Sequence, residues 1–275
     1  MNLSEMRSVL DESGIQLTKS LGQNFLHDGN QLRRIVAAAE LQPTDRVLEI
    51  GPGLGPLTEQ LLEHAGEVFA VEKDLRLVTL LQKRLGAQPK LRLLHGDGLE
   101  IVRANASDWA GWKLVANLPY SVASPILVEL ASNVHPPERM TATLQIEVAR
   151  RLMAKGGADD YGLLSLLVQL RFEPKGMFKI PSGCFFPPPD VDSACITLVR
   201  RERELLPESL RPTFVRIVKR AFSQRRKMMV KLLKQDWAVE QLEAAISELQ
   251  ISPLIRAEAV TLEQFVRLTE MLAAP

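Results

Sequence analysis

The sequence predicts an α/β protein with a mainly parallel sheet, followed by a smaller domain built from helices only. In the first two-thirds of the chain, short apolar runs rich in Val, Leu and Ile alternate with helical patterns. This alternation is typical of βαβ units. Past Arg200 only helical patterns remain. We therefore expect one domain over residues 1–200 and a second, all-helical domain over residues 201–275.

The expected strands are short, mostly apolar segments separated by helical or turn patterns. In chain order they are Arg46–Ile50, Glu67–Val71, Leu91–Leu94, Lys113–Ala116, Thr143–Glu147, Phe172–Ile180 and Ala194–Arg200. A proline-rich loop, Phe185–Pro189, separates the last two, and its proline run excludes regular structure there. A helix is expected over Gln145–Leu152.

The second domain begins with an amphipathic helical pattern. Its apolar residues fall at helical spacing, at Phe214, Ile217, Val218, Ala221 and Phe222. Further helical patterns cover Val239–Leu249 and Thr261–Leu272, and Ser252-Pro253 separates them.

Composition is that of an ordinary globular protein, with 275 residues, 46% apolar and 24% charged residues. No run approaches the roughly 18 apolar residues of a membrane span. The segment Met1–Ser20 contains acidic residues and lacks the apolar stretch of a secretory signal. We expect a cytoplasmic protein with no membrane partner.

Metal and acyl-transfer chemistry find no support in the sequence. Cys184 and Cys195 are the only cysteines and do not form a Cys-x-x-Cys pair. The four histidines lack metal-ligand spacing, and no Gly-x-Ser-x-Gly motif is present. We expect no metal.

A glycine-rich turn, Gly51–Gly55, links the first strand to a helix. Such a turn lets a ligand approach the backbone closely. Pro56 stands where the dinucleotide fingerprint needs a glycine, which weakens a nicotinamide-cofactor interpretation. Glu72 ends the next strand about 20 residues later, where these folds bind ribose hydroxyls. Asp97 ends the strand after that, although an aspartate at this position, taken alone, is more typical of a solvated turn.

The most informative motif is Asn117-Leu118-Pro119-Tyr120, directly after the strand Lys113–Ala116. The Asn117 side-chain oxygen and the Leu118 carbonyl can both accept hydrogen bonds from the exocyclic amine of a nucleobase. Pro119 restricts Leu118 to an extended conformation. Tyr120 offers a stacking face worth roughly 1–3 kcal/mol per base. Taken alone, the motif also suits a strand that ends in a proline turn beside a core tyrosine.

Together, the glycine turn, Glu72, Asp97 and Asn117 follow strands of one predicted sheet. The carboxyl ends of such strands line the crevice where open α/β sheets bind ligands. A single cleft containing all of them is therefore expected.

A locally basic stretch lies in the second domain. Nine basic residues and no acidic ones occur between Arg211 and Lys234, inside a chain whose net charge is +1. This pattern suggests a surface for phosphates, with a solvated helix face as the alternative.

Several motifs, in order, resemble those of the ribosomal RNA adenine dimethyltransferases, and most closely their small-subunit branch. They cover residues 19 to about 230. These motifs are Lys19–Leu26, Leu48–Gly53, Val71–Asp74, Asn117–Tyr120, Gln145–Leu152, Pro187–Ala194 and Arg225–Lys227. The resemblance implies a class I, Rossmann-like fold that binds S-adenosylmethionine and dimethylates adenine N6.

The resemblance also implies roles for individual residues. Those expected to hold the cofactor are Asn24, Leu26, Gly51, Glu72, Asp97 and Asn117. Those expected at the target base are Asn117 and Leu118, which would aim N6, and Tyr120 with Phe185, which would stack on the base. Gln23 and Phe25 would support that pocket. Arg225, Arg226 and Lys227 would contact RNA.

The implied partner is ribosomal RNA in the immature small subunit, bound by a monomer. Within the same chemistry, the alternative is a large-subunit RNA methyltransferase of the antibiotic-resistance type. From a different class, the alternative is a non-catalytic assembly factor that has kept the fold. Ile146, Leu163 and Asp190 stand where the family usually has basic residues, which affects the RNA-facing segments rather than the methyl-transfer groups.

Overall fold

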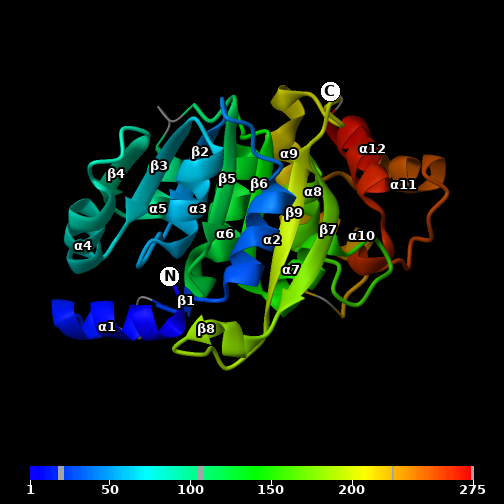
Figure 1. The fold of residues 1–275 in the computed structure, drawn as a ribbon. Helices are drawn as coiled ribbons and strands as arrows, with labels where there is room; N and C mark the ends of the chain where they lie inside the picture. The colour runs from blue at the N-terminus through cyan, green and yellow to red at the C-terminus, as the bar shows by residue number, and fades with distance from the viewer. Residues whose placement is uncertain (18–21, 105–107, 225, 274–275) are drawn as a thin grey trace. The chain divides into compact units, whose positions relative to one another are not determined.

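The computed structural model describes residues 1–17, 22–104, 108–224 and 226–273. Internal contacts divide the chain into two compact units. The first comprises residues 1–149 and 174–200, and the second comprises residues 150–173 and 201–275. The first contains the sheet expected from the sequence, and the second is mainly helical (Figure 1).

Among the described residues, seven strands form one sheet in the order β4-β3-β2-β5-β6-β9-β7. Strands β2, β3, β4, β5 and β6 pair in parallel, whereas β9 pairs antiparallel with β6. The strand bounds are β2 Arg46–Ile50, β3 Glu67–Glu72, β4 Leu91–His95, β5 Trp112–Asn117, β6 Arg139–Gln145, β7 Phe172–Ile180 and β9 Ser193–Arg200. Two short strands, β1 Phe25–Leu26 and β8 Phe185–Phe186, pair separately.

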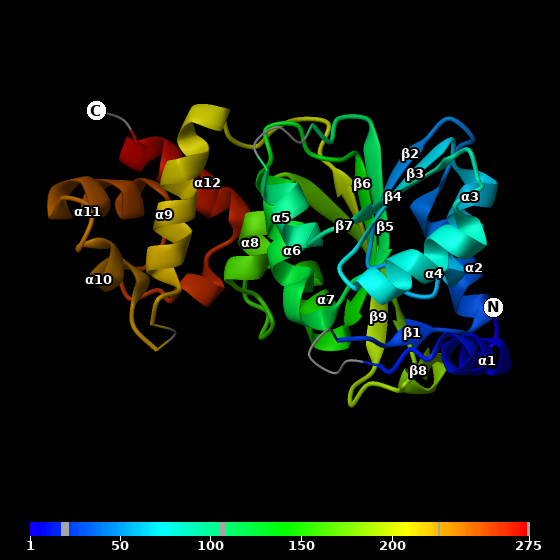
Figure 2. The ribbon, with the colours of Figure 1, turned by 90° about the vertical axis from the view of Figure 1, so that its left-hand side faces the viewer.

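Helices cover both faces of this sheet: α2, α3 and α4 lie on one face, and α5 and α6 on the other (Figure 2). The helices of the first part of the chain are α1 Leu3–Ser13, α2 Gly29–Ala39, α3 Pro56–His64, α4 Leu75–Leu85, α5 Gly98–Arg103, α6 Tyr120–Ser132 and α7 Ile146–Met153. Because both faces are covered, the central strands β2, β3 and β5 are almost entirely buried.

The remaining helices are α8 Leu163–Gln169, α9 Arg211–Ala221, α10 Met229–Leu233, α11 Val239–Glu248 and α12 Leu262–Ala273. Short 3₁₀ turns cover Ser182–Cys184, Glu208–Leu210 and Ala257–Ala259. The second unit has its own apolar core, in which Phe214, Phe265 and Leu268 are fully buried. Helices α9, α11 and α12 therefore belong to one packed bundle.

The second unit differs from the continuous domain 201–275 expected from the sequence, because it also takes in residues 150–173. Tyr161, Leu166 and Leu170 are buried in the same apolar cluster as Phe214 and Phe265. The boundary therefore depends on which core these apolar side chains enter, and the change of pattern at residue 201 does not reveal that.

The strand expected at Thr143–Glu147 instead spans Arg139–Gln145, and helix α7 begins at Ile146. In β6 all residues from Met140 to Leu144 are buried, as in a central strand that is covered on both faces. Beyond Gln145 the buried positions follow helical spacing. Near residue 145 the apolar residues fit both strand and helix spacing. The sequence pattern therefore placed the boundary between the strand and the helix too late.

The proline-rich loop also differs from expectation, since Phe185–Phe186 forms β8, which pairs with β1. These two residues precede the prolines and therefore retain backbone N–H donors for pairing. Residues Phe25 and Phe186 are paired, as are Leu26 and Phe185. The pairing holds the segment before α2 against the loop before β9.

Candidate active site

A pocket lies at the carboxyl ends of β2, β3 and β5, within the first unit. Five short segments contribute its main lining: Gly22–Phe25, the glycine turn, Glu72–Lys73, Asp97–Leu99 and Asn117–Val122. The first segment comes from the N-terminal part of the chain, whereas the others follow strands of the sheet or begin the helices after them. The cleft expected from the sequence is thus formed, and it contains Gly51, Glu72, Asp97 and Asn117.

The glycine turn has a backbone that side chains would obstruct. Gly51 and Gly53 have φ values of +74° and +61°, in the left-handed region. A Cβ atom on Gly53 would lie 2.6 Å from the Phe25 ring. The Gly53 N–H also donates to Glu72 Oε2 at 3.1 Å. Glycine is therefore required at position 53 for both conformation and space.

Glu72 is buried at the end of β3, with 7% of its surface exposed. Its second oxygen, Oε1, accepts a hydrogen bond from the Asp74 N–H at 2.9 Å. Burial raises the pKa of this carboxyl, while the N–H groups of Asp74 and Gly53 partly oppose the shift. These two backbone donors hold the carboxylate at the pocket wall.

Asp97 caps helix α5, where its Oδ1 accepts from the Leu99 N–H at 2.8 Å. Its other oxygen pairs with Lys73 Nζ at 2.7 Å. The hydrogen bond from Lys73 lowers the pKa of Asp97, so the group is a carboxylate at neutral pH. Asp97 is thus both a structural cap and an acceptor at the pocket.

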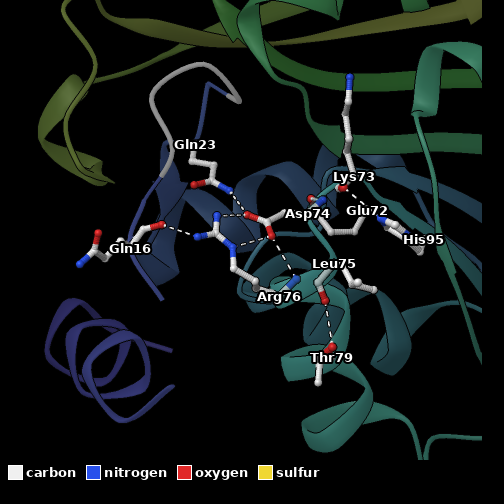
Figure 3. A network of polar contacts seen from close by, with 9 residues as sticks. All are labelled: Gln16, Gln23, Glu72, Lys73, Asp74, Leu75, Arg76, Thr79 and His95. Atoms are coloured by element: carbon white, nitrogen blue, oxygen red, sulfur yellow. Dashed lines mark hydrogen bonds and ion pairs between the residues drawn. The ribbon is translucent and has the colours of Figure 1, made fainter. Parts of the chain in front are cut away.

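A polar network beside Glu72 holds the N-terminal segment of the pocket (Figure 3). Asp74 Oδ2 accepts from Gln23 Nε2 at 3.0 Å and pairs with the Arg76 guanidinium at 2.5 Å. Arg76 also donates to the Gln16 backbone oxygen at 3.1 Å. Hydrogen bonds from Arg76 and Gln23 lower the pKa of Asp74 to about 2. The ionised Asp74 therefore holds Gln23 directly and is connected to Gln16 through Arg76.

Asn117 has its amide orientation determined by the backbone. Its Nδ2 donates to the Asn24 carbonyl oxygen at 3.0 Å. Because a carbonyl oxygen can only accept, the nitrogen must face Asn24. The Asn117 Oδ1 atom is buried and has no hydrogen-bond partner within the described chain. Buried polar atoms are nearly always paired, so this oxygen indicates a ligand donor.

The residues after Asn117 continue the pocket wall. Leu118 is buried, and its N–H donates to the Thr143 carbonyl oxygen at 3.0 Å. Pro119 caps α6 with an extended ψ of 127°. The Tyr120 hydroxyl hydrogen-bonds Ser193 Oγ at 2.5 Å, and burial raises its pKa. The ring of Tyr120 is therefore held at the pocket as a neutral aromatic face.

Two expected site residues do not line this pocket. Leu26 and Phe185 are each 2% exposed and belong to the apolar core that also contains Ile35 and Val47. Their backbones pair in the β1–β8 ribbon, which turns both side chains inward. Phe185 therefore lies in the apolar core, whereas Tyr120 lines the pocket.

The expected RNA-contacting residues belong to the second unit. Arg226 and Lys227 are exposed in the turn between α9 and α10. Arg225 lies outside the described residues, as do Lys19, Ser20 and Leu21 of the first motif.

The role of Asp74 is the feature that sequence reasoning missed. A signal was available, because Asp74 stands between the strand-end acid and an apolar-periodic helix, the position of an N-cap. Within the described ranges, no cluster of three metal-binding side chains occurs. In the same residues, no helix is long and apolar enough to cross a membrane.

Comparison with known proteins gives a consistent result. Residues 14–274 match the family model described as "Ribosomal RNA adenine dimethylase". A Ribosomal RNA small subunit methyltransferase A from Geobacillus sp. is 39% identical, covering 97% of this chain and 95% of its own. The protein of that name from Geobacter metallireducens is 39% identical, covering 95% and 97% respectively.

Two solved structures are similar in fold over most of the chain. The 23S rRNA methyltransferase ErmE shares 29% identity with a TM-score of 0.70, covering 91% of this chain and 100% of its own. A dimethyladenosine transferase from Plasmodium falciparum shares 24% identity with a TM-score of 0.72, covering 89% and 95%. These similarities confirm the Rossmann-like α/β fold expected from the sequence.

Proposed function

The chain belongs to the ribosomal RNA adenine dimethylase family, and from this premise we propose that it transfers methyl groups from S-adenosylmethionine to N6 of adenines in small-subunit ribosomal RNA. The product is N6,N6-dimethyladenosine. The observation that carries the proposal is the buried, unpartnered Oδ1 of Asn117 at the pocket wall. A buried oxygen without a partner can accept a hydrogen bond from the N–H of a nucleobase amine.

The pocket residues fit the proposed cofactor. The glycine turn leaves the backbone free of side chains, as close contact with a ligand requires. Glu72 is the acceptor suited to ribose hydroxyls, and Asp97 is the acceptor suited to an adenine amine. Asn24 would close the pocket from the N-terminal segment. When bound, S-adenosylmethionine supplies an electrophilic methyl group.

The chain itself contributes mainly alignment. Asn117 Oδ1 and the Leu118 carbonyl would accept from the target amine, while the ring of Tyr120 would stack against the base. With both N–H groups of the amine held by acceptors in the plane of the base, the lone pair of N6 would point out of that plane. Correct positioning of reactants lowers a barrier by roughly 7–11 kcal/mol, so no strong general base is needed.

The chemistry of the amine accounts for two rounds of transfer. A singly methylated N6 still carries one N–H that Asn117 can accept. A dimethylated N6 has none, so the acceptors at this site have no donor left. The reaction therefore stops at the dimethyl product.

Arg225, Arg226 and Lys227 would hold RNA phosphates from the second unit. Each phosphate contact releases counterions, so binding should weaken steeply as salt increases. We place this activity on immature small subunits in the cytoplasm, with the protein acting as a monomer.

Two other functions are tested by the same assay. Large-subunit RNA is the substrate named for ErmE, but the relatives at 38–39% identity carry the small-subunit name. A non-catalytic assembly factor would bind immature subunits without transferring methyl groups. Labelled methyl donor, offered with immature small subunits and with naked large-subunit RNA, separates these outcomes. N6-dimethyladenine in the small-subunit RNA supports the proposal, and its absence contradicts it.

A further inference from the structure

A groove in the second unit has the composition of a nucleotide-binding surface. It lies among α10, α11 and the segment that follows α11, and its volume is about 490 Å³. Its lining includes Met228, Lys231, Ile246, Ile251 and Leu254. We propose that this groove holds an unstacked nucleotide of the ribosomal RNA, at a site separate from the methyl-transfer pocket. The inference rests on the proposed function, which supplies RNA as the partner.

The apolar part of the groove is unusually accessible. Leu254 is 71% exposed, the highest value among the large hydrophobic side chains of the described chain. Met228 is also exposed, whereas Val230 and Ile246 of the same lining are buried. Single exposed apolar residues are ordinary, but these two border one cavity of ligand size. A flat apolar group such as a nucleobase would cover them.

The cations of the basic stretch fall into two groups. Those in the first group form ion pairs or a ring contact within the protein. Arg211 pairs with Glu204 at 2.6 Å, Arg220 pairs with Asp236 at 2.5 Å and Lys234 pairs with Glu243 at 3.2 Å. Arg216 lies over the Trp237 ring, 4.2 Å from its centre. About half of the basic residues noted in the sequence therefore have internal roles.

The second group is Lys219, Arg226, Lys227 and Lys231. All four are exposed and have no carboxylate partner among the described residues. Lys231 lines the groove, and Arg226 and Lys227 immediately precede Met228 at its edge. Glu243 is the acidic residue of the lining, and Lys234 neutralises it. Unpaired positive charge is thus concentrated where apolar surface is exposed.

This combination favours RNA over an apolar peptide. A splayed nucleotide presents a phosphate and a flat base with low polarity on its faces, and RNA is read mainly through such unstacked bases. Lys231, Arg226 and Lys227 would contact the phosphates, while Leu254 and Met228 would contact the base. An acidic amphipathic peptide of a ribosomal protein is the competing occupant, which the test below separates.

The test compares two matched full-length variants, Leu254→Asp and Val239→Asp. Both place one negative charge at an exposed apolar position of the second unit, but Val239 does not line the groove. Affinity is measured by filter binding to two probes: naked small-subunit RNA transcribed in vitro, and small subunits from cells lacking this protein. We expect Leu254→Asp to raise the Kd for both probes about tenfold, and Val239→Asp to change it less than twofold.

A third variant, Lys231→Glu, should weaken binding to a similar extent and reduce the dependence of the Kd on salt. Unchanged affinity of Leu254→Asp for both probes would overturn the inference. Weakened binding to subunits alone, with naked RNA unaffected, would also overturn it and assign the groove to a ribosomal protein. Methyl transfer by the unmodified protein is measured in parallel. If the unmodified protein transfers methyl groups while Leu254→Asp binds normally, the groove inference fails and the proposed function stands; if it transfers none, the proposed function fails whatever the binding shows.

Discussion

The Nδ2 group of Asn117 donates a hydrogen bond to the backbone oxygen of Asn24, although 93 positions separate the two residues. This bond fixes the orientation of the amide. Nδ2 faces Asn24, and Oδ1 is left without a hydrogen-bond partner among the described residues. The N-terminal segment therefore does more than border the pocket. It determines which atom of Asn117 a ligand meets.

Replacement of Asn117 by alanine should lower turnover about a hundredfold, because a preorganised hydrogen-bonding group of this kind contributes on that scale. Affinity for the cofactor should change little, since Glu72, Asp97 and the glycine turn remain. Turnover is measured with labelled methyl donor, and affinity by calorimetry. Unchanged turnover would remove Asn117 from the mechanism.

Glu72→Gln should have the opposite profile. The variant keeps the shape of the side chain but loses the charge that strengthens hydrogen bonds to ribose hydroxyls, each worth about 1.5–3 kcal/mol. We expect cofactor affinity to fall roughly tenfold or more, while turnover at saturating cofactor is retained. Normal affinity in calorimetry would show that the ribose is held elsewhere.

Gln23 and Asp74 should act as one unit in positioning Asn24 and, through it, Asn117. Gln23→Met removes the donor to Asp74, and Asp74→Ser keeps a cap for α4 but cannot reach Gln23. Each variant should lower turnover several-fold. The double variant should be no worse than the more damaging single one, because both break the same contact. If the fold-losses of turnover in the two single variants multiply in the double variant, Gln23 and Asp74 have independent roles.

Gly53→Ala should destabilise the protein more than Gly111→Ala does. Both glycines have positive φ, at +61° and +73°, so the backbone strain is similar. A Cβ at position 53 would meet the Phe25 ring at 2.6 Å, whereas nothing lies within 4 Å of one at position 111. The collision should cost about 1–3 kcal/mol of unfolding free energy beyond the control. Urea unfolding measures both, and equal losses would show that Phe25 moves freely.

Glu49 should make stability depend on pH. It is 1% exposed beside Thr58, and burial raises its pKa to about 8, with the charge of Glu72 adding to the shift. Between its ordinary value of 4.5 and about 8, the unfolded chain ionises this group and the folded chain does not. Its contribution to the unfolding free energy therefore falls as pH rises, by up to about 1.4 kcal/mol per pH unit.

Glu49→Gln should remove that slope and raise the unfolding free energy above pH 7, because a neutral side chain of equal size never has to bury a charge. Urea unfolding between pH 5 and pH 9, with the unmodified protein beside it, provides the measurement. Parallel curves for the two proteins would contradict the assignment.

Some features of the site follow from local patterns alone. Gly51, Glu72, Asp97 and Asn117 could be assigned to one cleft because each lies at or just past the end of a strand expected to run parallel to its neighbours. Parallel strands bring their carboxyl ends to one edge of a sheet. The period of the apolar residues is a local property, so the sequence reveals it directly.

Other features depended on which distant segments pack together. The pattern near residue 145 fitted both a strand and a helix, and burial of Met140 and Leu144 decided between them. Phe185 carried an expected role at the pocket, but pairing with Leu26 turned it into the core.

The sequence by itself determined the fold class, the order of the elements and the groups gathered at the sheet edge, because these depend on side-chain period and chemical type. Tertiary structure alone decided the orientation of the Asn117 amide, the anchoring of Gln23 by Asp74 and the division of the basic residues into paired and unpaired cations. Hydrogen bonds and ion pairs act over about 3 Å. Only the packing of the folded chain brings atoms from distant positions within that range.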